Sequence, residues 1–171
     1  SSETPVYSKR RVLYGLNLAK KSKRPNIILC EGNLDIVTLH QAGFDNAVAS
    51  MGTALTQEQL RLLSRYTKEL VLCYDNDNAG QQATRRALEL LNNSEFSVKV
   101  LQLPRRLVDG EYIKQDADDF IKFQGPAAFE RLLTGSENGV EFRLDQIAGK
   151  YDLTDDTQRI AYAQEVSEEL A

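Results

Sequence analysis

Two short apolar runs, each followed by an acidic residue, constrain the fold of this chain most strongly. Residues 27–30 are all apolar and are followed at once by Glu31. Residues 70–74 form a second apolar run, which precedes the sequence Asp75-Asn76-Asp77. Runs of this length are typical of strands that are buried on both faces of a parallel sheet. Since open α/β sheets hold ligands at the carboxyl ends of their strands, we expect Glu31 and Asp75 to lie in a functional site.

Strand and helix patterns alternate along the first part of the chain. A capping box of Thr56 and Gln59 marks the start of one helix. Parallel strands need crossover connections, which are usually helical and right-handed. The sequence therefore predicts an α/β fold with a mainly parallel four-stranded sheet that is flanked by helices. Strands are expected at about 26–31, 46–51, 69–75 and 96–103, and helices at about 34–42, 56–66 and 79–91.

The pattern changes after the fourth expected strand. Residues 105–115 are interpreted as a polar loop. The acidic residues 116–119 are expected to cap a short helix over 120–123. The sheet should then be followed by C-terminal helices, which are expected from Pro126, over 139–149 and over 154–170, the last one capped by Thr154.

The composition is that of an ordinary globular protein. The chain has 42% hydrophobic and 27% charged residues, which are typical proportions. It contains no apolar run of the roughly 20 residues that span a bilayer, and no signal-peptide pattern. Cys30 and Cys73 both lie inside expected strands and form no CxxC motif. We therefore expect them to pack in the core in a reducing compartment, rather than to form a disulfide or a zinc site.

The net charge of −4 hides a marked asymmetry along the chain. Residues 1–24 contain seven basic residues against Glu3 alone, so this segment carries +6 and the remainder −10. Two interpretations stay open. The segment is either a solvated basic surface, or an arm that holds an anionic polymer beside a carboxylate cluster.

Acidic residues recur where strands end or helices begin. A single Asp-x-Asp after a strand is more often a turn or a helix cap, but here two acidic strand ends are followed by a third acidic segment. Hard divalent cations prefer such oxygen ligands, and one ion can reach both strand ends only if the two strands are neighbours. His40 is the only histidine, which argues against most zinc chemistry and against a Ser-His or Cys-His nucleophile. The candidate ligands are Glu31, Asp75, Asp77, Asp116 and Asp118.

Phosphate binding by a glycine-rich loop is not indicated. The chain has neither a Walker A motif nor a GxGxxG motif. Phosphates would have to be held by metal ions and basic side chains, as in two-metal phosphoryl transfer. In the absence of metal, closely packed carboxylates should repel one another, which raises the cost of ionising them.

Two motifs resemble the Toprim domain, which occurs in bacterial primases, topoisomerases and some nucleases. They are Glu31-Gly32-Asn33-Leu34-Asp35 and Cys73-Tyr74-Asp75-Asn76-Asp77-Asn78-Ala79-Gly80. Further segments resemble the bacterial DNA primase branch, and the resemblance covers residues 3–135. These segments are Leu13-Tyr14-Gly15-Leu16, Ala42-Gly43-Phe44, the run from Ala47 to Thr56, and Asp116-Ala117-Asp118-Asp119-Phe120.

The resemblance implies the catalytic fragment of a primer-synthesising RNA polymerase. It implies that Glu31, Asp75 and Asp77 are catalytic, and that these three with Asp116 and Asp118 bind Mg²⁺ or Mn²⁺. Lys9, Arg10 and Arg11 would contact DNA or nucleotide. The implied partners are a single-stranded DNA template, ribonucleoside triphosphates and the RNA primer, in the bacterial cytoplasm at the replisome and without a membrane. A zinc site and contact with the replicative helicase would belong to domains absent here, so the fragment should be inactive alone.

The same resemblance suggests a division of the chain and leaves alternatives. Residues 1–25 would be a basic segment before the Toprim domain, 26–125 the Toprim domain, and 126–171 a truncated helical extension. Asn33 and Asn76 depart from the family pattern, although Asn at position 76 tolerates a positive φ and should keep the turn. The alternatives are the Toprim domain of a topoisomerase or nuclease that cuts DNA, and a non-catalytic DNA-binding module.

Overall fold

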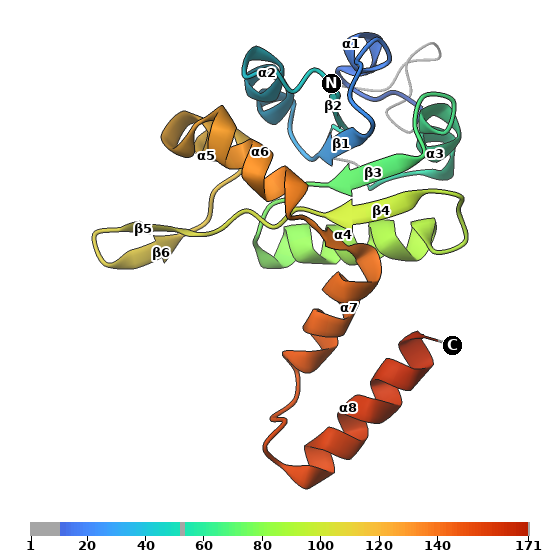
Figure 1. Ribbon diagram of the computed structural model, residues 1–171, viewed down its shortest axis with the longest axis vertical. Helices are drawn as coiled ribbons and strands as arrows, with labels where there is room; N and C mark the ends of the chain where they lie inside the picture. The colour runs from blue at the N-terminus through green and yellow to red at the C-terminus, as the bar shows by residue number, and fades with distance from the viewer. Residues whose placement is uncertain (1–10, 52–53, 171) are drawn as a thin grey trace. The chain divides into compact units, whose positions relative to one another are not determined.

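Four parallel strands lie at the centre of the larger part of the chain (Figure 1). The structure is a computed structural model that describes residues 11–51 and 54–170. It divides into two units, Ser1–Ser136 and Glu137–Ala171. In the first unit the strand order is β2-β1-β3-β4. The strands are β1 (Ile27–Cys30), β2 (Ala47–Ala49), β3 (Glu69–Leu72) and β4 (Ser97–Val100).

The pairing of β1 and β3 places the two acidic strand ends side by side. β1 pairs in parallel with both β2 and β3, and β3 pairs in parallel with β4. This confirms the predicted four-stranded parallel sheet and the predicted neighbours. The chain runs outward from β1 to β2 and then returns to β3 on the other side of β1. Ligands of open α/β sheets bind at such a reversal of strand order, outside the carboxyl ends of the strands.

Helices cover both faces of this sheet. Right-handed crossovers place α2 (Asn33–Gln41) on one face, and α3 (Gln57–Leu63) and α4 (Asn78–Leu91) on the other. Figure 1 shows α2 and α4 on opposite sides of the strands. The predicted capping box is confirmed, since the Oγ1 of Thr56 accepts from the backbone N–H of Gln59 at 3.1 Å.

The residues just before α1 (Leu16–Ala19) form a short bridge to β2 at the edge of the sheet. Tyr14 and Ala49 exchange two backbone hydrogen bonds of 2.9 and 3.0 Å. The short helix α1 follows and leads toward β1. This part of the chain therefore packs against β2, although it precedes the first strand of the sheet.

A β-hairpin occupies the segment that was predicted to be a polar loop, so that prediction is wrong. β5 (Arg106–Val108) pairs in antiparallel fashion with β6 (Glu111–Ile113). Asp109 and Gly110 form the turn with φ values of 51° and 85°. An Asp-Gly pair between short apolar segments is a strong signal for a two-residue hairpin, and this signal was overlooked because polar residues surround it.

Two helices complete the first unit. α5 (Ala117–Gln124) is longer than predicted, and α6 (Pro126–Thr134) begins at the expected proline. Both helices contribute to the main apolar cluster, in which Phe120 and Phe129 pack with β1, β2, β3 and α2. Cys30 and Cys73 are buried and free, as expected for core residues.

The second unit consists of β7 (Glu137–Asn138), α7 (Gly139–Ala148) and α8 (Asp156–Glu169). The cap of α8 is Asp155, whose side chain accepts from the N–H of Gln158, and not the predicted Thr154. An ion pair of 2.6 Å between Arg143 Nε and Glu169 Oε1 links the two helices. None of the helices in the described ranges is both long and apolar enough to cross a membrane.

Candidate metal centre

Glu31 and Asp75 meet at the carboxyl ends of β1 and β3. The strand pairing continues one residue beyond β3, where the N–H of Cys73 donates to the carbonyl of Leu29 at 2.9 Å. The backbone N–H of Asp75 then donates to the Glu31 carboxylate. Oε1 of Glu31 is buried, and it has no hydrogen-bond partner among residues 11–51 and 54–170. A buried carboxylate oxygen without a donor is suited to a cation.

The electrostatics of these two carboxylates agree with the predicted repulsion. Burial raises the pKa of Glu31, and the negative charge of Asp75 raises it further. Burial likewise raises the pKa of Asp75, with an additional contribution from Asp116. Both groups are therefore costly to ionise in the folded protein until positive charge is supplied.

Asp77 departs from that prediction, because its pKa is lowered. The Nζ of Lys114 lies 2.7 Å from its Oδ2, and this contact is the largest cause of the lowered pKa. The N–H of Gly80 donates to Oδ1 at 2.8 Å, which makes Asp77 the N-cap of α4. The expected destabilisation at Asp77 is thus wrong, since a lysine from the base of the hairpin already neutralises this carboxylate.

Gly80 allows α4 to begin directly against the strand-end loop. A Cβ atom at this position would lie 1.9 Å from the carbonyl oxygen of Asp75. No side chain fits at that distance, and the clashing atom belongs to the backbone. The close approach sets the positions of Asp75 and Asp77 relative to the helix. The glycine of the motif is therefore required for the geometry of the site.

Asn76 keeps its place by side-chain hydrogen bonds rather than by an unusual backbone conformation. Its Nδ2 donates to the carbonyl of Leu103 at 3.1 Å, and its Oδ1 accepts from Gln81 at 3.3 Å. It is not among the described residues with a positive φ. The tolerance of asparagine for a positive φ is therefore not used at this position. Asn33, the other departure from the family pattern, is the exposed first residue of α2.

The third acidic segment brings three carboxylates together at the start of α5. Oxygens of Asp116, Asp118 and Asp119 all lie within 4.8 Å of one another. Asp116 also raises the pKa of Asp75 through its charge, which connects this triplet to the strand ends. Asp119 was not predicted as a ligand. It was missed because it was assigned only to the helix cap, where its N–H indeed donates to Asp116 Oδ1 at 2.7 Å.

Asp118 is held by two donors from neighbouring elements. Its Oδ1 accepts from the hydroxyl of Thr38 on α2, and its Oδ2 lies 2.5 Å from Nζ of Lys122. The Lys122 contact, followed by the Thr38 contact, lowers the pKa of Asp118. In this structure Asp118 therefore joins α2 to α5 while it remains part of the acidic triplet.

Asp35 is a buried acid that sequence reasoning quoted in a motif but did not assign to the site. Its Oδ2 accepts from the N–H of Gly32 at 3.1 Å, and its Oδ1 accepts from the N–H of Asp118 at 3.2 Å. Burial is the main cause that raises its pKa to about 6. Asp35 thus ties the start of α2, which follows Glu31, to the start of α5, which carries the acidic triplet.

The donor set fits a hard divalent cation. All the candidate ligands are carboxylates, and Asp116 and Asp118 form a close triplet with Asp119. Oε1 of Glu31 is buried without a partner in the described part of the chain. Such ligands suit Mg²⁺ or Mn²⁺ better than softer metals. The acidic cluster is therefore consistent with divalent metal binding. Of the predicted DNA-contacting residues, Arg11 is exposed, whereas Lys9 and Arg10 lie outside the described residues.

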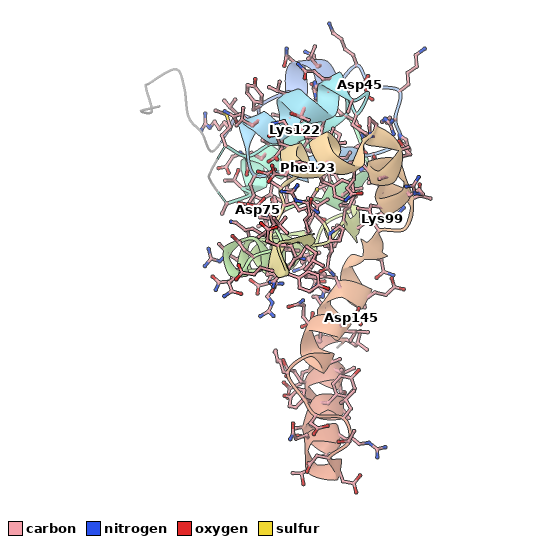
Figure 2. All side chains as sticks on the ribbon, turned by 90° about the vertical axis from the view of Figure 1, so that its left-hand side faces the viewer. Asp45, Asp75, Lys99, Lys122, Phe123 and Asp145 are labelled. Atoms are coloured by element: carbon pink, nitrogen blue, oxygen red, sulfur yellow. The ribbon has the colours of Figure 1, made fainter. Side chains whose placement is uncertain are left out.

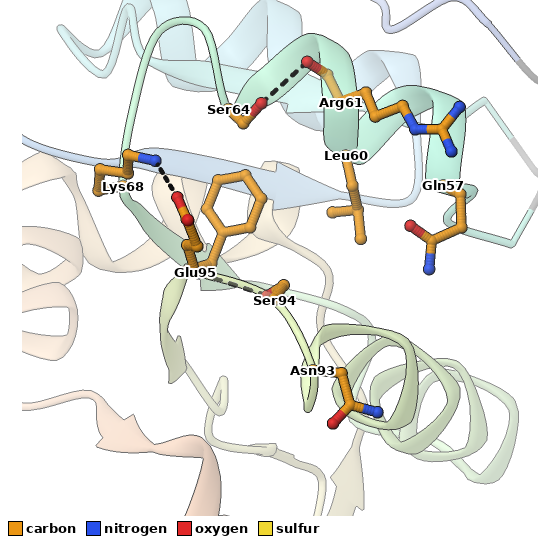
Figure 3. Close-up of a pocket in the computed structure, with 9 residues that line it drawn as sticks. Gln57, Leu60, Arg61, Ser64, Lys68, Asn93, Ser94 and Glu95 are labelled. Atoms are coloured by element: carbon orange, nitrogen blue, oxygen red, sulfur yellow. Dashed lines mark hydrogen bonds and ion pairs between the residues drawn. The ribbon is translucent and has the colours of Figure 1, made fainter.

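A separate pocket lies at the opposite end of the strands from the carboxylates, near the amino ends of β3 and β4 (Figure 3). Its volume is about 280 Å³, and its lining includes Leu60, Arg61, Lys68 and Phe96. Lys68 is paired there with Glu95 at 2.8 Å. Since this pocket contains none of the clustered carboxylates, its charged residues can serve as distant controls.

Comparisons with known proteins agree with the geometry. A family model described as Toprim-like matches residues 28–121, more than half of the chain. A DNA primase of Clostridium acetobutylicum is 38% identical over 169 residues, which are 98% of this chain and 27% of that protein. A DNA primase of Enterococcus faecalis is 36% identical over 174 residues, 99% of this chain and 26% of that protein. The chain thus spans about a quarter of these relatives.

Solved structures of primase catalytic domains are also similar to this chain. A DnaG primase catalytic domain bound to single-stranded DNA matches 96% of this chain and 52% of its own, with a TM-score of 0.77 and 31% identity. The catalytic core of the Escherichia coli primase matches 100% of this chain and 60% of its own, with a TM-score of 0.76 and 30% identity. The chain belongs to the Toprim-like family and, within it, to the branch found in the catalytic core of DnaG-type bacterial DNA primases, of which it spans a part.

Proposed function

We propose that this chain supplies the metal-binding carboxylates for RNA primer synthesis on a single-stranded DNA template. The observation that carries the proposal is the meeting of Glu31 and Asp75 at the ends of β1 and β3, where a buried Glu31 oxygen has no donor among the residues that the structure describes. The structural relative that holds single-stranded DNA supports the choice of template. Because the chain spans only part of the primases it matches, we propose that it binds metal but does not synthesise primers alone.

In this proposal each carboxylate has a distinct role. Glu31 and Asp75 would hold Mg²⁺ or Mn²⁺ from the two strand ends, and Asp116 and Asp118 from the start of α5. When bound, the ions would activate the attacking 3′-hydroxyl and stabilise the pyrophosphate that leaves the ribonucleoside triphosphate. Asp77 would contribute once its Oδ2 is released from Lys114. Asp35 and Thr38 would keep the ligand-bearing elements in register.

A divalent metal is expected to stabilise the chain against heat. Supplying positive charge relieves the costly ionisation of Glu31 and Asp75, so Mn²⁺ at about 100 times its Kd should add about 2.7 kcal/mol. That increment corresponds to a rise in Tm of about 5 °C or more. The measurement is a melting curve with and without Mn²⁺. A melting temperature that does not respond to Mn²⁺ would show that these carboxylates bind no metal.

Two substitutions make the test specific. Asp75→Asn should remove the metal response, whereas Asp145→Asn on α7, labelled in Figure 2, should retain it.

Without metal, Asp75→Asn should be at least as stable as the wild type at neutral pH, because a raised pKa means that the ionised form costs stability above that pKa. This advantage should disappear as the pH falls below the pKa of aspartate in the unfolded chain. Asp77→Asn should instead be less stable, since it loses the pairing with Lys114.

The basic arm gives a separate prediction on template binding. Replacing Lys9, Arg10 and Arg11 together by alanine should weaken single-stranded DNA binding and reduce the slope of log K against log salt by about 2. The measurement is fluorescence anisotropy of a labelled oligonucleotide over a salt series. Lys68→Ala, at the opposite end of the strands, is the control. An unchanged slope in the triple variant would identify the arm as a solvated surface.

A further inference from the structure

One face of the β5–β6 hairpin packs against α5, and the other face is exposed. The Arg106 guanidinium lies 3.6 Å from the centre of the Phe123 ring on α5. At the base, Nε2 of Gln115 donates to the carbonyl of Pro104 at 2.6 Å. Two-stranded hairpins are rarely stable alone, so these contacts explain why this one is formed. Figure 2 looks onto the side of the molecule that carries Phe123 and Asp75.

The register assigns each side chain of the hairpin to one of two faces. Arg106 pairs with Ile113, and Arg106 contacts α5, so this face is turned toward α5. Leu107 pairs with Tyr112 on the other face. There, Leu107 is 57% exposed and Tyr112 is 69% exposed. Tyr112, the one aromatic residue of the hairpin, therefore lies on the face turned away from α5.

Two basic residues lie next to this exposed pair, at the base of the hairpin. Arg105 comes directly before Arg106, and Lys114 comes directly after Ile113. The alternation of side chains, continued by one residue, places Arg105 and Lys114 on the face of Leu107 and Tyr112. We call these four residues the platform face. It contains no carboxylate, because Glu111 lies on the other face and Asp109 in the turn. Lys114 joins the base of the platform face to Asp77 at 2.7 Å, so the face is continuous with the metal centre.

We propose that the platform face binds single-stranded DNA at the metal centre, with a base stacked on Tyr112. This rests on the proposed function, which places a template strand at the carboxylates. Basic side chains next to an exposed aromatic ring are the composition that binds single strands, because each base offers a face for stacking and each nucleotide a phosphate. Duplex DNA fits less well, since its bases are already stacked. A second copy of the chain fits poorly, because a symmetric contact would oppose the same cations.

The absence of tryptophan from the sequence makes a direct test available. The Tyr112→Trp variant of the 171-residue chain is titrated at low salt with a single-stranded oligonucleotide, and binding is followed independently by anisotropy of a label on the DNA. The tryptophan fluorescence of this variant should be quenched in step with binding. Tyr112→Ala should bind about tenfold more weakly, whereas Tyr112→Phe should bind as the wild type does. Tyr66→Ala, an exposed tyrosine next to α3, should bind normally.

Other results would overturn the inference. These are wild-type affinity of Tyr112→Ala, no quenching at saturation, no binding at low salt, tighter binding of duplex DNA or RNA of the same length, or self-association that Tyr112→Ala abolishes. Melting curves of each variant identify any that fail to fold, and Leu107→Ser then repeats the test from the neighbouring position. The Mn²⁺ response and its loss in Asp75→Asn report on the proposed function separately, so failure of the platform face leaves that result intact.

Discussion

Glu31→Gln in a complete primase of this branch is expected to abolish metal-dependent primer synthesis, with a loss of about a thousandfold or more. The substitution keeps the shape of the side chain but removes the anionic charge at the end of β1. The fold should survive, because the amide oxygen of glutamine can still accept from the N–H of Asp75. Template binding should also largely survive, since Glu31 contributes no positive charge to it. The measurement is primer synthesis with Mg²⁺ or Mn²⁺, paired with DNA binding.

Glu95→Gln provides the matched control for this prediction. Glu95 lies beside the separate pocket and pairs with Lys68 at the opposite end of the strands. The Glu95→Gln variant should therefore synthesise primers at the normal rate. Normal synthesis by Glu31→Gln would show that this residue is not a ligand, whereas loss of template binding together with activity would indicate a structural role.

Gly80→Ala is expected to have the largest effect on stability, with a decrease in Tm of at least about 5 °C. The added methyl group would lie 1.9 Å from the carbonyl oxygen of Asp75 and 2.7 Å from its carbon. These backbone atoms cannot rotate away as a side chain can, so the start of α4 must move. That movement shifts Asp75 and Asp77, and the Mn²⁺ response should decrease as well.

Gly135→Ala is the matched glycine control in the first unit. A Cβ there would meet only the carbonyl oxygen of Arg131, at an ordinary contact distance of 3.5 Å. Its melting temperature should remain within about 1 °C of the wild type. Equal stability of the Gly80→Ala variant would mean that the helix start tolerates displacement, and that the motif glycine has another function.

The sequence was sufficient for most of the sheet because three of its strands, β1, β2 and β3, are largely buried on both faces. Such strands appear as short apolar runs, and the four residues of β1 are at most 3% exposed. The position of Glu31 next to Asp75 followed from the rule that parallel strands end at the same edge. The hairpin was missed because its strands are three residues each and largely exposed, so apolar periodicity gave little signal. The Asp109-Gly110 pair is the one local signal that favours a hairpin there.

The charge environment of the site was less predictable than its ligands. Asp75 and Asp77 are two residues apart, but the pKa of one is raised and that of the other is lowered. Burial is the main cause that raises the pKa of Asp75, whereas the hydrogen bond from Lys114 is the main cause that lowers the pKa of Asp77. Lys114 is 37 residues from Asp77 along the chain. The contact between Lys114 and Asp77 depends on where the folded hairpin places its last residues, which local sequence patterns do not reveal. The role of Asp35 was unpredictable for the same reason, because its partner Asp118 belongs to α5, far away in the sequence.

In the proposed function, the ion pair between Lys114 and Asp77 would couple metal binding to template binding. The ammonium group of Lys114 lies 2.7 Å from Oδ2 of Asp77. Its positive charge would oppose a cation at the same carboxylate, so the lysine would lower the apparent affinity for metal. A DNA phosphate that drew Lys114 away would strengthen metal binding. By thermodynamic reciprocity, bound metal would then strengthen DNA binding by the same factor. The hairpin lysine would thereby provide positive cooperativity between cofactor and template.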